Sequence, residues 1–87
     1  GQVRFYPGDQ DNRFLSLSNR SGKNITLSMA CFSEQQISFT IKEKGRYKIS
    51  LNGLAPNTVY PVTINGSEKK IASTKDGTIT ITGYKVK

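Results

Sequence analysis

The feature that most constrains the fold of this chain is the alternation of apolar and polar residues over short segments. Residues 78–82 read Thr-Ile-Thr-Ile-Thr, and residues 23–32 alternate in the same way, with Ile25 and Leu27 on the apolar parity. A repeat of two places apolar side chains on one face of a β-strand, whereas a helix needs them every three or four residues. No segment keeps a helical repeat over two turns. The sequence therefore predicts seven to eight short strands in two antiparallel sheets that pack on their apolar faces.

Glycine-containing turns indicate how neighbouring strands pair. Residues 43–45, Glu-Lys-Gly, are predicted to join strands at residues 35–42 and 46–52 in a hairpin with Lys42 opposite Arg46. In that register every apolar residue of both strands lies on one face, and a slip of one residue would lose the agreement.

Two later turns predict two more hairpins. Asn65-Gly66 is the favoured two-residue turn and pairs Tyr60 with Ile71. Residues 75–77, Lys-Asp-Gly, are expected to close a hairpin that pairs Ile71 with Ile81. Tyr60, Ile71 and Ile81 would then form one row across three strands.

Two residues are expected to interrupt the regular strands. Pro61 donates no backbone hydrogen bond, so its amide position must point away from a neighbouring strand, or the strand must be bulged or at an edge. Gly83 follows the alternating segment 78–82 and is predicted to form a β-bulge that re-aims Tyr84 and Val86.

A corner precedes the strand that begins near Tyr60. Its pattern is formed by Leu54, Pro56, Thr58, Tyr60 and Val62. A tyrosine in such a place can bury its ring and return its hydroxyl to the backbone of the corner, as in immunoglobulin-like sandwiches. The spacing resembles the E-to-F corner of fibronectin type III domains, and this resemblance implies an immunoglobulin-like, fibronectin-III-like β-sandwich. Leu54, Pro56, Thr58, Tyr60 and Val62 are the structural corner residues.

The end of the chain resembles another group of domains. Asn-Gly, then Lys-Lys-Ile, then Lys-Asp-Gly-Thr-Ile-Thr-Ile is similar to the closing strands of small sandwich domains appended to secreted bacterial polysaccharide lyases and glycoside hydrolases. The resemblance implies a non-catalytic accessory or structural module of a secreted, periplasmic or cell-surface protein that processes carbohydrate, with a neighbouring catalytic domain as its partner.

Length and composition restrict the functions that remain. The 87 residues are expected to form one domain, residues 1–87, and a monomer. No run of 18 apolar residues is present, which predicts no membrane span. The chain has no histidine and one cysteine, Cys31, so we expect no enzyme, no transition-metal site and no cofactor. Residues 9–12, Asp-Gln-Asp-Asn, could offer oxygens to Ca²⁺ or form a plain Asx turn.

The charge balance favours an anionic partner. Thirteen Lys and Arg against six Asp and Glu give a formal net charge of +7, and such an excess attracts acidic glycans, nucleic acid or a membrane surface. No basic helix and no aromatic RNA-binding motif accompanies the charge, so nucleic acid is not expected.

Two groups of residues are candidates for binding carbohydrate. An acidic polysaccharide would use the basic strand face of Lys42, Lys44, Arg46 and Lys48. A neutral sugar would use an exposed aromatic platform at Tyr6 and Phe32, whose parity differs from that of the apolar residues of their strands. The alternatives are a solvated basic face and aromatic residues that cover the ends of the sandwich.

Overall fold

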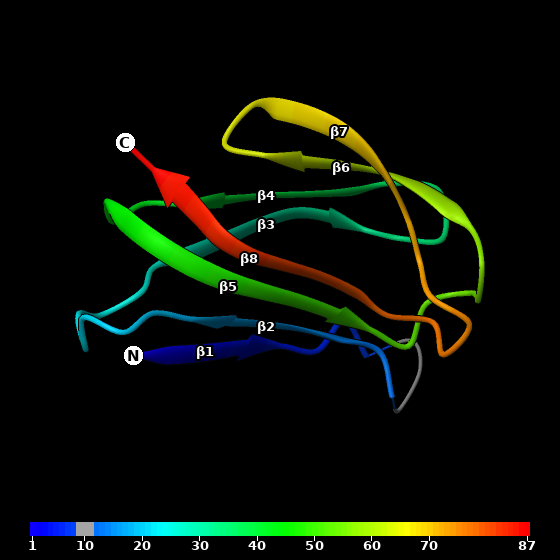
Figure 1. The fold of residues 1–87 in the computed structure, drawn as a ribbon, viewed down its shortest axis with the longest axis horizontal. Helices are drawn as coiled ribbons and strands as arrows, with labels where there is room; N and C mark the ends of the chain where they lie inside the picture. The colour runs from blue at the N-terminus through cyan, green and yellow to red at the C-terminus, as the bar shows by residue number, and fades with distance from the viewer. Residues whose placement is uncertain (9–11) are drawn as a thin grey trace.

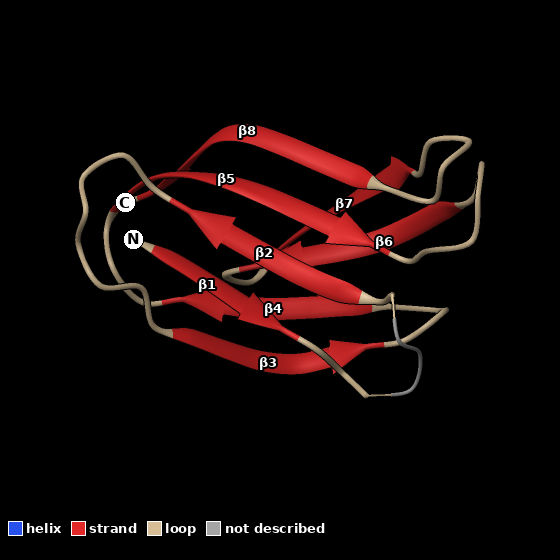
Figure 2. Ribbon diagram, turned by 90° about the horizontal axis from the view of Figure 1, so that it is seen from below, coloured by secondary structure: helices blue, strands red, loops and turns tan. Residues whose placement is uncertain are grey.

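The computed structural model describes residues 1–8 and 12–87, and these residues form a sandwich of two four-stranded sheets. Sheet A has the strand order β1-β2-β5-β8 and sheet B the order β3-β4-β6-β7 (Figures 1 and 2). None of the described residues belongs to a helix that could cross a membrane. The strands are β1 (Gln2–Phe5), β2 (Phe14–Ser18), β3 (Leu27–Phe32), β4 (Ile37–Ile41), β5 (Gly45–Asn52), β6 (Val59–Ile64), β7 (Ser67–Ala72) and β8 (Ile79–Val86).

The alternation in the sequence correctly predicts which side chains face the core. Sheet A contributes Leu15 and Leu17 from β2 together with Ile49 and Leu51 from β5, all fully buried. Their neighbours along each strand face outward. Sheet B closes the core from the other side with Ile37, Phe39, Ile41, Tyr60, Val62 and Ile64. The predicted all-β sandwich of two sheets packed around one apolar core is therefore confirmed.

The strand pairing differs from the expected arrangement at the turn of residues 43–45. Strands β4 and β5 do not form a hairpin, because β4 lies in sheet B between β3 and β6 while β5 lies in sheet A between β2 and β8. Phe39 is paired with Met29, and Ile49 with Leu17. A connection that crosses between the sheets lets both apolar faces meet across the core, which satisfies the same alternation as a hairpin would.

The turn at residues 75–77 is a second crossing between the sheets. Strand β7 ends the order of sheet B, whereas β8 pairs with β5 in sheet A and places Ile81 opposite Ile49. The predicted pairing of Ile71 with Ile81 is therefore wrong. The hairpin at Asn65-Gly66 is confirmed, with Tyr60 opposite Ile71.

Sheet B is mixed rather than antiparallel. Strand β4 runs parallel to β6, with Ile37 paired with Val62, which corrects the expectation of two purely antiparallel sheets. This parallel pairing starts at Val62, one residue after Pro61, so the pairing of β6 with β4 requires no hydrogen bond from the proline.

The β-bulge predicted at Gly83 is confirmed. The register of β8 against β5 shifts between the pairs formed by Tyr47 and Ile49, and Gly83 has a φ of 67°.

Tyr60 forms the predicted corner. Its ring is 1% exposed, and its hydroxyl accepts a hydrogen bond from the backbone N–H of Ala55 at 2.9 Å. Ser73 ties the same corner to the end of β7, because its hydroxyl donates to the carbonyl of Ala55 at 2.6 Å and accepts from the N–H of Thr58 at 3.0 Å. The corner between β5 and β6 is thus held to the segment that follows β7.

Replacing Tyr60 by phenylalanine is expected to lower the free energy of unfolding by about 1–3 kcal/mol, because the N–H of Ala55 loses its partner in a partly buried site. Tyr84 offers a matched control, since its hydroxyl donates to the carbonyl of Ile64 over a longer 3.3 Å. Urea unfolding of Tyr60→Phe and Tyr84→Phe measures both losses. Equal losses of unfolding free energy in the two variants would show that the Tyr60 hydroxyl does not stabilise the corner more than the Tyr84 hydroxyl stabilises its own contact.

Candidate functional site: a basic pocket beside Tyr47

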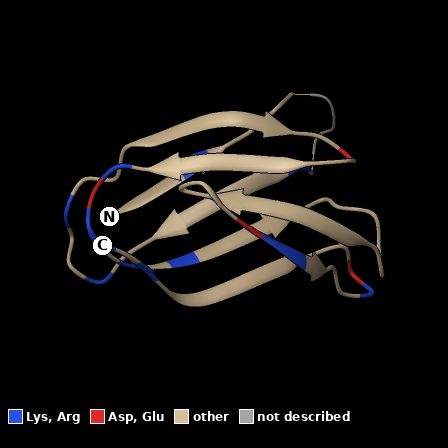
Figure 3. Ribbon diagram, turned by 90° about the horizontal axis from the view of Figure 1, so that it is seen from above, with Lys and Arg blue, Asp and Glu red and all other residues tan. Residues whose placement is uncertain are grey.

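Lysine and arginine residues gather at one end of the sandwich. Figure 3 shows most of the blue segments at the end that carries both chain termini. This end is formed by the connection between β2 and β3, the connection between β4 and β5, and the last residues of β8. The charge excess seen in the sequence is therefore concentrated rather than spread evenly over the surface.

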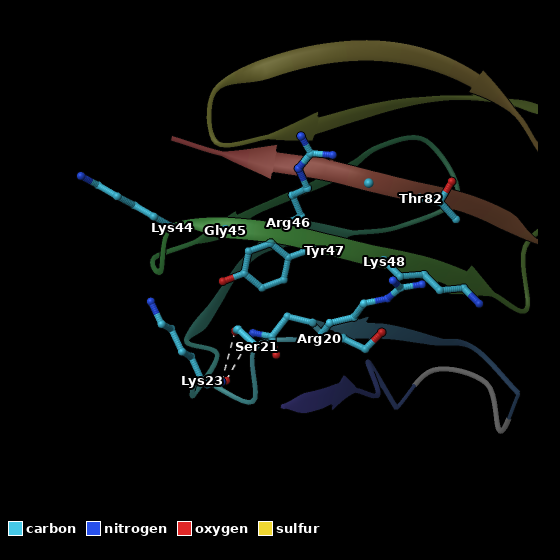
Figure 4. A pocket seen from close by; sticks show the side chains of 12 residues that line it. Arg20, Ser21, Lys23, Lys44, Gly45, Arg46, Tyr47, Lys48 and Thr82 are labelled. Carbon is cyan, nitrogen blue, oxygen red and sulfur yellow. Dashed lines mark hydrogen bonds between the residues drawn. The ribbon is translucent and has the colours of Figure 1, made fainter.

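A pocket of about 590 Å³ opens at this end. Five cationic side chains line it, and no carboxylate does so among the described residues. Figure 4 shows the five cationic side chains, which come from β5 and from the two connections beside it. The lining residues are Ser18, Asn19, Arg20, Ser21, Lys23, Lys44, Gly45, Arg46, Tyr47, Lys48, Thr82 and Gly83.

Tyr47 holds one of the chain segments that line the pocket. Its side chain belongs to the core and is 2% exposed, and its hydroxyl donates to the backbone carbonyl of Glu43 at 2.7 Å. Burial raises the pKa of the Tyr47 hydroxyl, with a further contribution from the negative charge of Glu43. The tyrosine therefore stays neutral and holds the 42–44 connection against the start of β5.

The connection after β2 is braced by Asn19. The Oδ1 of Asn19 accepts from the N-terminal amine of Gly1 at 2.8 Å, and its Nδ2 donates to the carbonyl of Lys23 at 3.3 Å. The N–H of Lys23 donates to the hydroxyl of Ser21 at 3.3 Å (Figure 4). These contacts fold residues 19–23 back on themselves and present Arg20 to the pocket.

The carboxylate of Glu43, in the 42–44 connection, binds Thr26. Both oxygens of Glu43 accept hydrogen bonds from Thr26, one from its N–H and one from its hydroxyl, each at 2.6 Å. The bond from the hydroxyl, followed by the bond from the N–H, lowers the pKa of Glu43 below its ordinary value of 4.5. Glu43 thus clamps this connection to the segment before β3 and does not line the pocket between Lys44 and Arg46.

This clamp predicts a dependence of stability on pH. The lowered pKa of Glu43 means that the unfolded chain takes up the proton at a higher pH than the folded chain. The stabilising contribution is therefore fully present above about pH 4.5 and is lost as pH falls through the lowered pKa. Urea midpoints of wild type and Glu43→Gln should differ at neutral pH and converge in acid. A difference that stays constant into acid would contradict the clamp.

The structure brings together three of the four basic residues that the sequence indicated. Lys44, Arg46 and Lys48 line the pocket, whereas Lys42 is exposed outside it. Arg46 was expected to pair with Lys42, but it is paired with Lys85 of β8. Two like charges therefore face each other across β5 and β8 instead.

Sequence reasoning missed the contribution of the connection after β2. Arg20 and Lys23 reach the pocket because Ser18 is paired with Lys48, which carries the following residues past the start of β5. A prediction that β2 pairs with β5 would have found these two residues. The turn at residues 43–45 instead predicted β4 as the hairpin partner of β5, so this pairing was not expected.

The two predicted aromatic residues lie apart from each other. Tyr6 follows β1, is 54% exposed and lies beside Phe14, with ring centroids 5.3 Å apart. Phe32 is half-buried at the end of β3 and lines a separate small pocket with Arg13 and Glu34, whose Nη2 and Oε1 are 3.8 Å apart. The two rings therefore do not form one platform.

Metal-binding groups are sparse in the part of the chain that is described. Residues 1–8 and 12–87 contain no group of three or more His, Cys, Asp or Glu placed to hold a metal ion. The candidate calcium loop at residues 9–12 lies, apart from Asn12, outside the described residues. Cys31 is half-buried and unpaired by any disulfide, with its sulfur 3.6 Å from the carbonyl of Gln36.

The fold and the pocket define a two-sheet, eight-stranded β-sandwich with a basic pocket at one end. Comparisons of the chain with models of protein families, with curated proteins and with solved structures find no match.

Proposed function

We propose that this chain is a non-catalytic accessory module of a secreted, carbohydrate-processing protein, and that it binds acidic polysaccharide in the basic pocket. The observation that carries the proposal is the lining of the pocket: five cations converge there from the β2–β3 connection, the β4–β5 connection and strand β5, and no carboxylate of the described residues lines it. Like charges held close together repel one another, and an anionic ligand would relieve that repulsion.

The polar neighbours of the cations suit a sugar. Arg20 and Arg46 offer planar forks that match the two oxygens of a carboxylate or sulfate. Ser18, Ser21 and Thr82 add hydroxyls that both donate and accept hydrogen bonds, as the hydroxyls of a sugar do. A polysaccharide with a repeated acidic group offers both kinds of partner at once.

The finer placement of the fold is part of the same proposal. The Tyr60 hydroxyl bound to the N–H of Ala55 supports a relation to immunoglobulin-like and fibronectin-III-like sandwiches, in which such a corner recurs. The parallel pairing of β4 with β6 departs from the antiparallel sheets of those folds. We therefore place the chain near them as a variant with a mixed second sheet.

Calorimetric titration with a uronate polymer, polygalacturonate, and a sulfated polymer, heparin, tests the proposal. Because both termini lie at the basic end, the protein should carry no tag. We expect binding of at least one polymer that weakens steeply as salt is raised, since exposed charges are screened over about 10 Å at 0.1 M salt. A neutral polysaccharide and a single-stranded oligonucleotide are the controls. Absence of binding to both acidic polymers, or equally tight binding of the oligonucleotide, would overturn the proposal.

A further inference from the structure

The outer face of sheet A continues from the basic pocket as a row of small polar side chains. Ser18 and Lys48 are paired in the pocket, and two residues further along the strands Ser16 is paired with Ser50. Thr80 of β8 extends this second row on one side and Arg4 of β1 extends it on the other. Leu15, Leu17, Ile49 and Leu51 are buried on the opposite face, so these alternating polar residues face outward.

The row ends at two aromatic side chains, the half-buried Phe14 and the exposed Tyr6, which together are called the aromatic cluster. Phe14 is paired with Asn52, and the ring of Tyr6 lies beside it at a tilt of 32°. The guanidinium carbon of Arg4 lies 5.3 Å from the centroid of the Phe14 ring, and its Nη1 donates to the Tyr6 hydroxyl at 3.4 Å. Tyr6 is thus held in place while 54% of it is exposed to solvent.

The pocket and the aromatic cluster lie at two ends of one surface. Phe14 and Ser18 are four residues apart along β2, so their backbones are separated by roughly 13 Å at about 3.3 Å per residue. The side chains of the row between them are Ser16, Ser50 and Thr80, with Arg4 at the β1 end, and none of the described residues of these outward rows is acidic. An anionic chain would meet no negative charge from these rows between the two ends.

Resting on the proposed function, we infer that the binding surface extends from the basic pocket along the outer face of sheet A to Tyr6, and that the ligand is a chain of sugars long enough to reach both. The pocket binds acidic groups of the chain. The exposed ring of Tyr6 packs against the C–H face of one sugar, which buries apolar surface on both partners. Arg4 supplies a further cation beside that sugar.

Oligosaccharides of increasing length, prepared from whichever acidic polymer binds, test this extension with wild type, Tyr6→Ala, Tyr6→Phe and Val59→Ala. Val59 is the matched control because it is 59% exposed and lies in sheet B. Tyr6→Ala should lower the affinity for long oligosaccharides about 10-fold and leave that for the shortest unchanged, which corresponds to the loss of one aromatic contact. Tyr6→Phe and Val59→Ala should bind as wild type does.

The possible results separate the two proposals. If wild type binds long and short acidic oligosaccharides but Tyr6→Ala binds the long ones as tightly as wild type, the extension to Tyr6 is wrong and the pocket stands. If wild type binds no acidic oligosaccharide or polymer, the proposed function itself fails. A loss in Tyr6→Ala that is the same for every length would place the ring in the pocket's own contacts and would also overturn the extended surface.

Discussion

Reversing the charge of Arg20, Arg46 and Lys48 together should reduce the affinity for acidic polysaccharide by about 100-fold or more. An exposed ion pair contributes about 0.2–1 kcal/mol, and reversal replaces each attraction by a repulsion, so three reversals reach the about 2.7 kcal/mol that a 100-fold loss requires. The three residues come from two of the three chain segments that line the pocket, residues 18–23 and 44–48. Titration of the triple glutamate variant against the bound polymer measures the loss.

The matched control reverses Lys69, Lys70 and Lys75, which are exposed in β7 and in the turn after it. Both triple variants lower the net charge by the same amount, so a nonspecific effect of total charge would weaken them equally. We expect the control to retain affinity within about threefold of wild type, since its charges lie outside the pocket. Equal losses of affinity in the two variants would show that the pocket is not the binding site. Circular dichroism of both variants checks that they remain folded.

Replacing Gly77 by alanine is expected to lower the free energy of unfolding by about 3–5 kcal/mol. Gly77 has a φ of +75°, and a Cβ at this position would overlap the backbone carbonyl oxygen of Leu54. The same segment is fixed by a hydrogen bond from the N–H of Leu54 to the carbonyl of Gly77 at 2.9 Å, so the backbone is not free to move away. A domain of this size has only about 5–15 kcal/mol of stability in total.

Gly66 provides the control for this substitution. Its φ of +82° is as unfavourable for alanine as that of Gly77, but a Cβ there would meet no atom within 4 Å. Gly66→Ala should therefore cost only about 1–2 kcal/mol, the expense of a left-handed residue. Thermal or urea unfolding of both variants isolates the overlap with Leu54. Losses that agree within about 0.5 kcal/mol would contradict the close approach at this corner.

The features that the sequence predicted correctly are those determined by neighbouring residues. Alternation assigns each side chain to a face, Asn65-Gly66 requires a tight turn, and the Tyr60 hydroxyl reaches a backbone group five residues earlier. Asn65 also shows what local reasoning leaves out. Its Oδ1 accepts from the N–H of Ile41 at 2.7 Å and its Nδ2 donates to the same residue's carbonyl at 3.0 Å, which extends the ladder between β4 and β6 by a side chain.

The choice of partner strands could not be predicted because it is not local. A short glycine-containing turn such as residues 43–45 can reverse the chain within a sheet or carry it across the core, and both outcomes bury Phe39 and Ile49. The same ambiguity limited the prediction of the residues that line the pocket. Lys44, Arg46 and Lys48 adjoin one another in sequence, whereas Arg20 joins them only through the pairing of β2 with β5.

A map of backbone amide chemical shifts during titration with the acidic polysaccharide shows whether this ligand occupies the basic pocket. We expect the largest shifts at residues 18–23, 44–48 and 82–83, which come from three separate parts of the chain and line one pocket. The chemical shifts of the backbone amides of β6 and β7 in sheet B should not change. Shifts centred on β7 and its lysines, or spread evenly over the charged surface, would contradict the account.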